Sequence, residues 1–287
     1  MQCEKPFMLS MKYMGRNLSN TYGIIDIGQV GLSNNSTLYV HTLKGADSEA
    51  LLKHFRVESA STTHFSFPAP DEARGVPPAS ALAFHSADPT IPIAVVADHE
   101  NEFLNPSYHS HTDTAALDGK GRLCQATQAV ASTLYSVMTD STEPVNISVD
   151  CDFVDELSRC LTSDFRCNMS YDLFGMFDGV ENEPVRLTNY VGVFGSSDSS
   201  VSVSTLGHFV RTLLLKRAPL DVEKDANCTE SKDCGEGYTC VGGRLSPGTG
   251  ICAKDHTVYH NAISPGFEYK SYSWKISNKS QPLWTES

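Results

Sequence analysis

Three potential metal ligands stand at alternate positions of one short segment, as His109, His111 and Asp113. Alternate residues of an extended segment point to the same side, so these side chains could converge on one ion. Catalytic zinc is held by three protein ligands and keeps a further position open for water. However, no oxygen or sulfur ligand elsewhere in the sequence is indicated as a supporting partner. We therefore favour His109 as a hydrogen-bonded loop residue over His109 as a metal ligand.

Motifs for other kinds of catalysis are missing from the sequence. There is no adjacent Glu-Glu pair, no Gly-x-Ser-x-Gly, no phosphate-binding Walker loop and no His-Glu-x-x-His. The glycine pattern GQVGL, residues 28–32, is too short to cradle a phosphate and is typical of a strand beside a bend. The residues predict a protein without enzymatic activity and without a cofactor.

The potential ligands follow a short apolar run, IPIAVVA, at residues 91–97. A short, continuous and β-branched run is typical of a strand that is buried on both faces of a mixed or parallel sheet. Such a strand would deliver Asp98 to the carboxyl edge of the sheet, where α/β proteins build their sites. The loop of residues 98–114 therefore lies where a ligand loop should lie.

The remaining patterns predict a sheet flanked by helices. Residues 23–44 indicate two short strands around a turn, and apolar spacing indicates helices near residues 48–57, 77–87, 116–139, 153–161 and 205–216, with further strands at 189–195 and 201–203. No internal repeat is evident. We expect an α/β fold with a mixed sheet, formed by residues 1–217, and a disulfide-rich segment with a tail over residues 218–287. Irregular structure is expected from residue 255 onward.

Charge and hydropathy exclude several classes of partner. The chain has 22 Lys and Arg against 34 Asp and Glu, a net charge of -12. This balance argues against nucleic acid or anionic lipid as a direct partner. No apolar run reaches the roughly 18 residues that a membrane-spanning helix needs, so we expect these residues not to span a bilayer.

Three blocks of the sequence resemble one known family. Residues 95–115, VVADHENEFLNPSYHSHTDTA, have the form of the last metal-ligand loop of a zinc aminopeptidase, with Asp-His followed by Tyr-His-Ser-x-x-Asp-Thr. The end of the chain, ISPGFEYKSYSWKISNKSQPLWTES, resembles the juxtamembrane end of the nicastrin ectodomain. The third block runs from residue 26 to residue 42 and contains Asp26, Gly28, Gln29, Val30, Tyr39, His41 and Thr42.

The resemblance to nicastrin carries its own expectations. It covers residues 23–287 and corresponds to the C-terminal half of a nicastrin ectodomain, with a fold like that of zinc aminopeptidases. His109 falls on the position of the final metal ligand, near Asp98 and Asp113, and is expected to be vestigial. The resemblance implies a non-catalytic subunit of gamma-secretase that supports assembly of the complex and gates its membrane-protein substrates.

The resemblance also implies partners and a location. The expected partners are the catalytic subunit presenilin, two smaller membrane subunits and type I membrane-protein substrates. The expected location is the extracellular or lumenal side of a membrane. The first twenty residues lack the apolar core of a secretory signal, so we expect that Met1 is not the natural start. A membrane span is expected after Ser287.

Glycosylation acceptors support a secretory location. Seven Asn-x-Ser/Thr sites are present, whereas chance placement of these residue types would give about 2.4. They begin at Asn17, Asn34, Asn35, Asn146, Asn168, Asn227 and Asn278. Because Asn34 and Asn35 overlap, we expect one of these two to be used.

The nine cysteines give a second indication of an oxidising compartment. Cys228, Cys234, Cys240 and Cys252 are separated by five, five and eleven residues, which favours disulfides over a zinc site. By analogy with small knots of this outline we pair Cys228 with Cys240 and Cys234 with Cys252, although four cysteines allow three connectivities. For the other cysteines we expect a bridge among Cys151, Cys160 and Cys167 and a buried free thiol at Cys124. We expect the partner of Cys3 to lie upstream of these residues.

Two other functions remain open from the sequence. One is an active secreted zinc aminopeptidase whose other ligands lie outside these residues. The other is a glycosylated extracellular binding module that uses the fold without membrane partners. A hydrophobic span soon after Ser287 would distinguish the gamma-secretase subunit from both.

Overall fold

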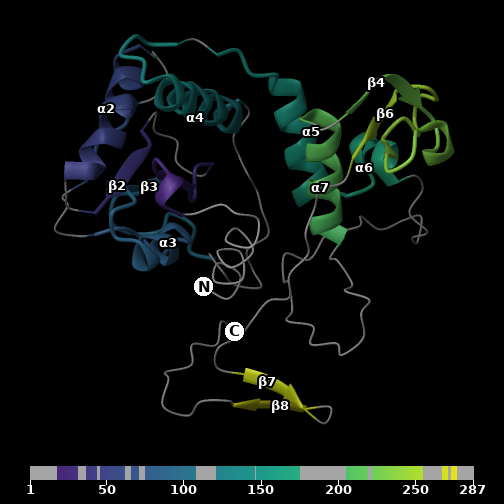
Figure 1. Cartoon of the computed structure of the whole chain (residues 1–287). Helices are drawn as coiled ribbons and strands as arrows, with labels where there is room; N and C mark the ends of the chain where they lie inside the picture. Colours follow the sequence, from purple (N-terminus) through teal and green to yellow (C-terminus); the bar gives the residue numbers. More distant parts are fainter. Residues whose placement is uncertain are drawn as a thin grey trace. The chain divides into compact units, whose positions relative to one another are not determined.

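A computed structural model gives the architecture of the chain (Figure 1). It describes residues 18–31, 37–43, 46–61, 66–70, 75–107, 121–145, 147–174, 205–218, 222–254, 267–270 and 273–276. The chain divides into two compact units, one formed by residues 1–155 with 262–287 and the other by residues 156–261. Each unit is described separately below.

The first unit contains a mixed three-stranded sheet in the order β1-β3-β2. Strand β3, Ile93–Ala97, pairs in parallel with β1, Ile24–Ile27, and antiparallel with β2, Tyr39–Thr42. All five residues of β3 are buried, as expected for a β-branched run at the centre of a sheet. The predicted strand at 91–97 and the two short strands within 23–44 are confirmed. The two short strands do not pair with each other, because β3 lies between them.

Helices cover both faces of this sheet (Figure 1). Helix α2, Ala46–Ser61, packs on β2, β3 and helix α4, Arg122–Thr139, whereas α3, Ala81–Ala87, packs on β1 and β3. Alternation along β3 explains the two layers, since Ala94 and Val96 join the apolar core formed with α2 and α4. The other members of that core are Leu38, Val40, Leu51, Leu52, Phe55, Phe67, Ala126 and Ala129.

The start of α4 corrects one prediction. Cys124, in the first turn of α4, is 1% exposed but is not a free thiol, because it forms a disulfide with Cys151 at the start of α5, Cys151–Thr162. The apolar spacing around Cys124 indicated an inward-facing side chain. It did not indicate which segment meets that side chain, because the partner comes 27 residues later in the chain.

The second unit packs helices beside a small sheet. Helix α7, Thr205–Arg217, contacts helix α6, Asn168–Phe174. It also contacts two strands of the sheet, β5 at Thr239–Val241 and β6 at Gly250–Ala253. The rings of Phe165 and Phe209 meet edge to face at 5.1 Å between centroids, and both are almost fully buried. The helices predicted near 153–161 and 205–216 are confirmed. The strands predicted at 189–195 and 201–203 lie outside the described residues.

The small sheet has the order β4-β6-β5, with β4 at Val222–Cys228 and the 3-10 turn η3 at Ser231–Asp233. Two disulfides hold it, joining Cys228 to Cys240 and Cys234 to Cys252. This is the connectivity that the analogy gave. A further disulfide joins Cys160 to Cys167. Cys3 lies outside the described residues.

The end of the chain differs from the expectation of irregular structure. Strands β7, Phe267–Lys270, and β8, Ser273–Ile276, form an antiparallel pair in the register Phe267 with Ile276. The alternating aromatic and β-branched residues of YSWKI carried a strand signal that the high Ser and Lys content masked.

The predicted fold class is confirmed as a mixed sheet flanked by helices with a disulfide-rich C-terminal elaboration.

Another short element is the 3-10 turn η1, Leu18–Asn20. Among the described residues, no helix is both long and apolar enough to cross a membrane.

Candidate functional site

The carboxyl edge of the mixed sheet holds the candidate site. Asp98 follows β3 directly and is 3% exposed, as the sequence predicted for this edge. Its backbone N–H donates to the carbonyl oxygen of Gln29 at 2.7 Å, which fixes the exit of β3 against the segment after β1. The other expected residues of the loop, His109, His111 and Asp113, lie outside the described residues.

A buried histidine on β2 supports this edge. His41 is 4% exposed, and its Nε2 lies 2.9 Å from the carbonyl oxygen of His99. Since a carbonyl only accepts, Nε2 must carry the proton and donate. Burial lowers the pKa of His41 below its ordinary value, and the hydrogen bond to His99 and the charge of Glu100 only partly offset this. His41 is therefore neutral at pH 7, and its Nε2 is engaged and unavailable to a metal ion.

His99 completes a small cluster of rings. Its ring lies 6.0 Å from the ring of His41 and 4.8 Å from that of Phe103, measured between centroids. Its Nδ1 lies 3.7 Å from Oδ1 of Asp98. These rings line a hollow of about 200 Å³ between β2, β3 and the segment before α3, bordered by His41, Gly75, Val76, Pro77, Pro78, His99, Glu100, Asn101, Glu102 and Phe103.

The first residue of α4, Arg122, interacts electrostatically with Asp98. Burial lowers the pKa of Arg122, and the charge of Asp98 acts in the opposite direction. The charge of Asp98 thus favours the charged form of a partly buried guanidinium. Arg122 was not singled out from the sequence, because the helix was expected to begin near residue 116.

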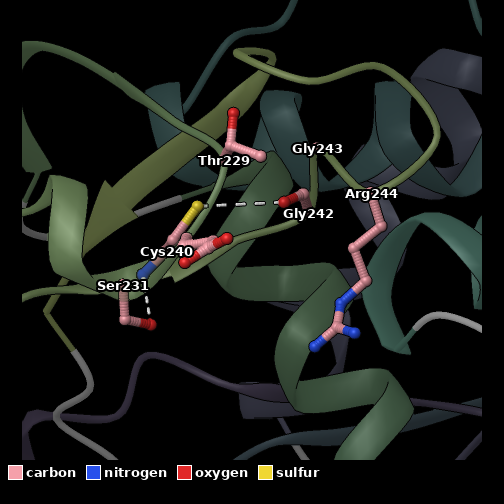
Figure 2. Close-up of a pocket in the computed structure, with 7 residues that line it drawn as sticks. Thr229, Ser231, Cys240, Gly242, Gly243 and Arg244 are labelled. Carbon is pink, nitrogen blue, oxygen red and sulfur yellow. Dashed lines mark hydrogen bonds between the residues drawn. The ribbon is translucent and has the colours of Figure 1, made fainter.

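A second hollow, of about 430 Å³, lies in the disulfide-rich unit (Figure 2). It is bordered by Thr229, Glu230, Ser231, Cys240, Gly242, Gly243 and Arg244. The backbone N–H of Cys240 donates to Oγ of Ser231 at 3.3 Å. The sulfur of Cys240 belongs to a disulfide and is not a nucleophile, so this hollow offers two hydroxyls, the carboxylate of Glu230 and the guanidinium of Arg244.

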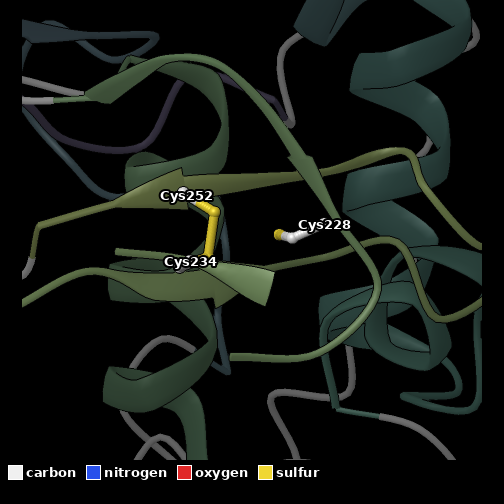
Figure 3. Close-up of side chains that lie close together, drawn as sticks. All are labelled: Cys228, Cys234 and Cys252. Carbon is white, nitrogen blue, oxygen red and sulfur yellow. A yellow bond between two sulfur atoms is a disulfide. The ribbon is translucent and has the colours of Figure 1, made fainter. Parts of the chain in front are cut away.

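Potential metal ligands come together in this same unit. Within the part of the chain that the structure describes, one group of at least three such side chains could share an ion: Cys228, Cys234 and Cys252, whose sulfurs lie within 4.8 Å of one another (Figure 3). All three are in disulfides. A thiolate is required to ligate metal, so the oxidised unit does not offer a site there.

Two of the seven glycosylation acceptors are among the described residues. Asn168 begins α6 and Asn227 lies in β4, and both side chains are exposed. Asn17, Asn34, Asn35, Asn146 and Asn278 lie outside the described residues.

Comparison with known proteins places these features in a family context. Residues 14–141 match the family model described as the nicastrin large lobe. Nicastrin of Arabidopsis thaliana is 26% identical over 98% of this chain and 42% of its own length. Nicastrins of Dictyostelium discoideum and Dictyostelium purpureum are 26% and 27% identical over 99% and 94% of this chain.

A solved structure shares the fold. The chain titled "Crystal structure of the gamma-secretase component Nicastrin" superposes with a TM-score of 0.66 and 23% identity, covering 93% of this chain and 45% of that one. The chain thus spans less than half the length of the nicastrins that it matches. The resemblance stated from three sequence blocks is confirmed, and this chain is similar to nicastrin over nearly all of its length.

Proposed function

We propose that this chain is part of the ectodomain of a non-catalytic gamma-secretase subunit. The observation that carries the proposal is the match to proteins named nicastrin over 94% to 99% of this chain. The shared fold with a structure titled as a gamma-secretase component supports it. In this proposal the chain supports assembly of the complex and gates or recognises type I membrane-protein substrates for intramembrane proteolysis.

The geometry at the sheet edge supports a structural role there. The Nε2 of His41 is engaged with the carbonyl oxygen of His99, just beyond the end of β3, and the backbone N–H of Asp98 donates to the carbonyl oxygen of Gln29. A hydrolytic zinc centre instead needs ligand atoms that face one open position and an activated water. We propose that His109 is a vestigial ligand position with no bound metal.

The expected environment is the extracellular or lumenal side of a membrane. Four disulfides support this location, because such bonds persist in oxidising compartments. The exposure of Asn168 and Asn227 supports glycosylation at those acceptors. The proposed partners are presenilin and the two smaller membrane subunits of gamma-secretase.

A gene-replacement experiment tests both parts of the proposal. The natural full-length protein and its His109→Ala variant are expressed in the organism's own cells after deletion of the gene, and cleavage of a type I membrane reporter is measured. We expect both proteins to restore cleavage. Failure of the natural protein would contradict a gamma-secretase role. Loss of cleavage in the variant, with normal amounts of folded protein, would contradict the non-catalytic assignment.

A further inference from the structure

The two described glycosylation acceptors share an unusual position beside a disulfide. Asn168 directly follows Cys167, which is bridged to Cys160. Asn227 directly precedes Cys228, which is the middle residue of the acceptor Asn227-Cys228-Thr229. Cys228 is bridged to Cys240. Both asparagine side chains are exposed, so a glycan would fit on the folded surface. The hydroxyl residues of the two acceptors differ from each other, since Ser170 is buried whereas Thr229 is exposed but hydrogen-bonded.

Ser170, the hydroxyl residue of the first acceptor, is buried in the folded protein. Its side chain is 0% exposed. Its hydroxyl oxygen lies within hydrogen-bonding distance of the carbonyl oxygen of Phe165 and 2.9 Å from that of Cys167. The backbone N–H of Ser170 also faces Sγ of Cys167 at 3.3 Å. Ser170 is therefore packed directly against Cys167, one end of the Cys160–Cys167 bridge.

The hydroxyl residue of the second acceptor, Thr229, is engaged in the disulfide-rich unit. Its Oγ1 accepts a hydrogen bond from the backbone N–H of Gly248 at 2.8 Å. The two preceding residues are held in the sheet, where Asn227 pairs with Ile251 and Cys228 with Gly250. A Cβ on Gly250 would lie 2.7 Å from the carbonyl oxygen of Cys228, so the two strands approach too closely here for a side chain at residue 250.

Transfer of a glycan needs both parts of an acceptor at once. The amide nitrogen of Asn forms a bond to the first sugar of a lipid-linked oligosaccharide, the bond from that sugar to the lipid pyrophosphate breaks, and the amide proton passes to a base of the transferase. The transferase must also reach the hydroxyl of the Ser or Thr. We propose that Asn168 and Asn227 accept glycans only before the Cys160–Cys167 and Cys228–Cys240 bridges close, and that the folded, oxidised protein is not a substrate.

The order of the cysteines along the chain makes the two sites unequal. The partner of Cys167 is Cys160, which enters the oxidising compartment first, so this bridge can close as soon as Asn168 arrives. The partner of Cys228 is Cys240, which arrives 12 residues later. At a synthesis rate of about 5 to 20 residues per second this delay is roughly one second. During this interval the Cys228–Cys240 bridge cannot yet form and so cannot compete with glycan transfer to Asn227. We therefore expect Asn227 to carry a glycan in a larger fraction of molecules than Asn168.

Two variants, each of which removes one of the two bridges, test the proposal. The proposal rests on the proposed lumenal location. The natural full-length protein, Cys160→Ser and Cys240→Ser are expressed in eukaryotic cells, and occupancy at each acceptor is measured by mass spectrometry of total cellular material. Neither substitution alters an acceptor, and total material includes chains that fail to fold. Cys160→Ser should raise occupancy at Asn168 from partial toward complete and leave Asn227 unchanged. Cys240→Ser should leave Asn168 unchanged.

Two measurements on the natural chain keep the test independent of those substitutions. A brief pulse of a membrane-permeable thiol reductant during synthesis should raise occupancy at Asn168. Folded, oxidised, unglycosylated protein given transferase and lipid-linked oligosaccharide should accept no glycan at either acceptor, whereas reduced and unfolded protein should accept both. Complete occupancy of Asn168 in the natural chain, or equal transfer to folded and reduced protein, would overturn the proposal.

The same data separate this proposal from the proposed function. If other acceptors carry glycans but Asn168 and Asn227 carry none in any variant, the timing proposal is wrong and the subunit assignment stands. If no acceptor in the chain carries a glycan, the proposed location is wrong as well.

Discussion

Single residues link distant segments of this molecule, and Asp172 in α6 is the clearest example. Its Oδ1 accepts hydrogen bonds from the backbone N–H groups of Gly243 at 3.0 Å and Leu245 at 3.3 Å, while Oδ2 meets Nζ of Lys216 in α7. Gly243 needs its positive φ of 83° and lacks room for a side chain, since a Cβ would lie 2.5 Å from N of Gly250. One carboxylate thus holds the glycine loop of the small sheet against two helices.

Replacing this carboxylate should loosen the second unit. Asp172→Asn keeps the shape but leaves Lys216 without its charged partner and weakens the bonds to the loop. Hydrogen bonds to charged groups contribute about 1.5 to 3 kcal/mol, so we expect a loss of that size in the free energy of unfolding. Glu236→Gln, an exposed carboxylate of the same unit, is the matched control in a denaturant titration. Equal stability of the two variants would show that Asp172 does not hold the loop.

The effect of Asp172 should depend on pH. Burial alone would raise its pKa, but the hydrogen bonds from Lys216, Leu245 and Gly243 outweigh burial and leave the pKa below its ordinary value. A lowered pKa contributes stability above the ordinary value of about 3.9, and this contribution is lost as pH falls through the folded-state pKa. The stability difference between natural protein and Asp172→Asn should therefore shrink below about pH 4.

A buried histidine should also make the first unit less stable as pH falls, but in a higher pH range than Asp172. His54 on α2 is 1% exposed, and its Nδ1 lies 2.8 Å from Oγ of Ser136 on α4. Burial lowers the pKa of His54, the charge of Lys53 lowers it further, and Asp140 offsets this only in part. Below about pH 6.5 the unfolded chain takes up a proton that the folded chain resists, so stability falls as pH drops.

The variant His54→Asn should flatten this acid dependence, because its amide can still bond to Ser136 but does not titrate. Some dependence should remain, since burial lowers the pKa of His41 as well. Thermal unfolding between pH 7 and pH 5 measures the effect, with His85→Asn as the control. An unchanged pH profile in His54→Asn would refute the assignment.

At the scale of elements, the disulfide-rich sheet depends on its bridges. Its strands β5 and β6 have only three and four residues, and few of their side chains are apolar and buried. Breaking a native bridge in such a segment costs on the order of 2 to 5 kcal/mol. We expect Cys234→Ser to increase hydrogen exchange of residues 228–252 and to impair secretion.

The control for this prediction is Cys160→Ser, which opens a bridge across only seven residues and should affect α5 and α6 instead. Mapping of thiols provides a direct check on the premise. Four free thiols among Cys228, Cys234, Cys240 and Cys252 in secreted protein would rule out the proposed role of the bridges.

The elements also show what the sequence could and could not predict. The strand β3 and the helices α2, α4 and α7 were predictable, because their apolar periodicity reflects burial by neighbours on either side. The hairpin β7–β8 was missed, because Ser and Lys weaken the strand pattern. The bridge from Cys124 to Cys151 was missed because spacing along one helix carries no information about a partner in another.

The candidate site was predictable only in its location. Asp98 was expected at the carboxyl edge of the sheet and lies there. Its surroundings include His41 on β2, which bonds to the backbone of His99, and Arg122 on α4, which interacts electrostatically with Asp98; both are far from Asp98 in the sequence. Their convergence depends on β2 pairing with β3 and on the position of α4 at this edge.

At the scale of the whole molecule, the proposed function makes this chain part of a larger assembly. The chain matches nicastrins over nearly all of its own length and less than half of theirs, so its partners must be tested in the natural protein. The relevant molecule is the full-length protein in its own membranes, carrying an affinity tag at a position outside these residues.

Affinity purification of that protein in mild detergent, followed by quantitative mass spectrometry, tests the central claim most directly. We predict that presenilin and the two smaller gamma-secretase subunits co-purify in amounts comparable to the tagged protein, and that a tagged unrelated membrane glycoprotein from the same cells does not recover them. Recovery of the intact, folded, tagged protein without presenilin would contradict the account.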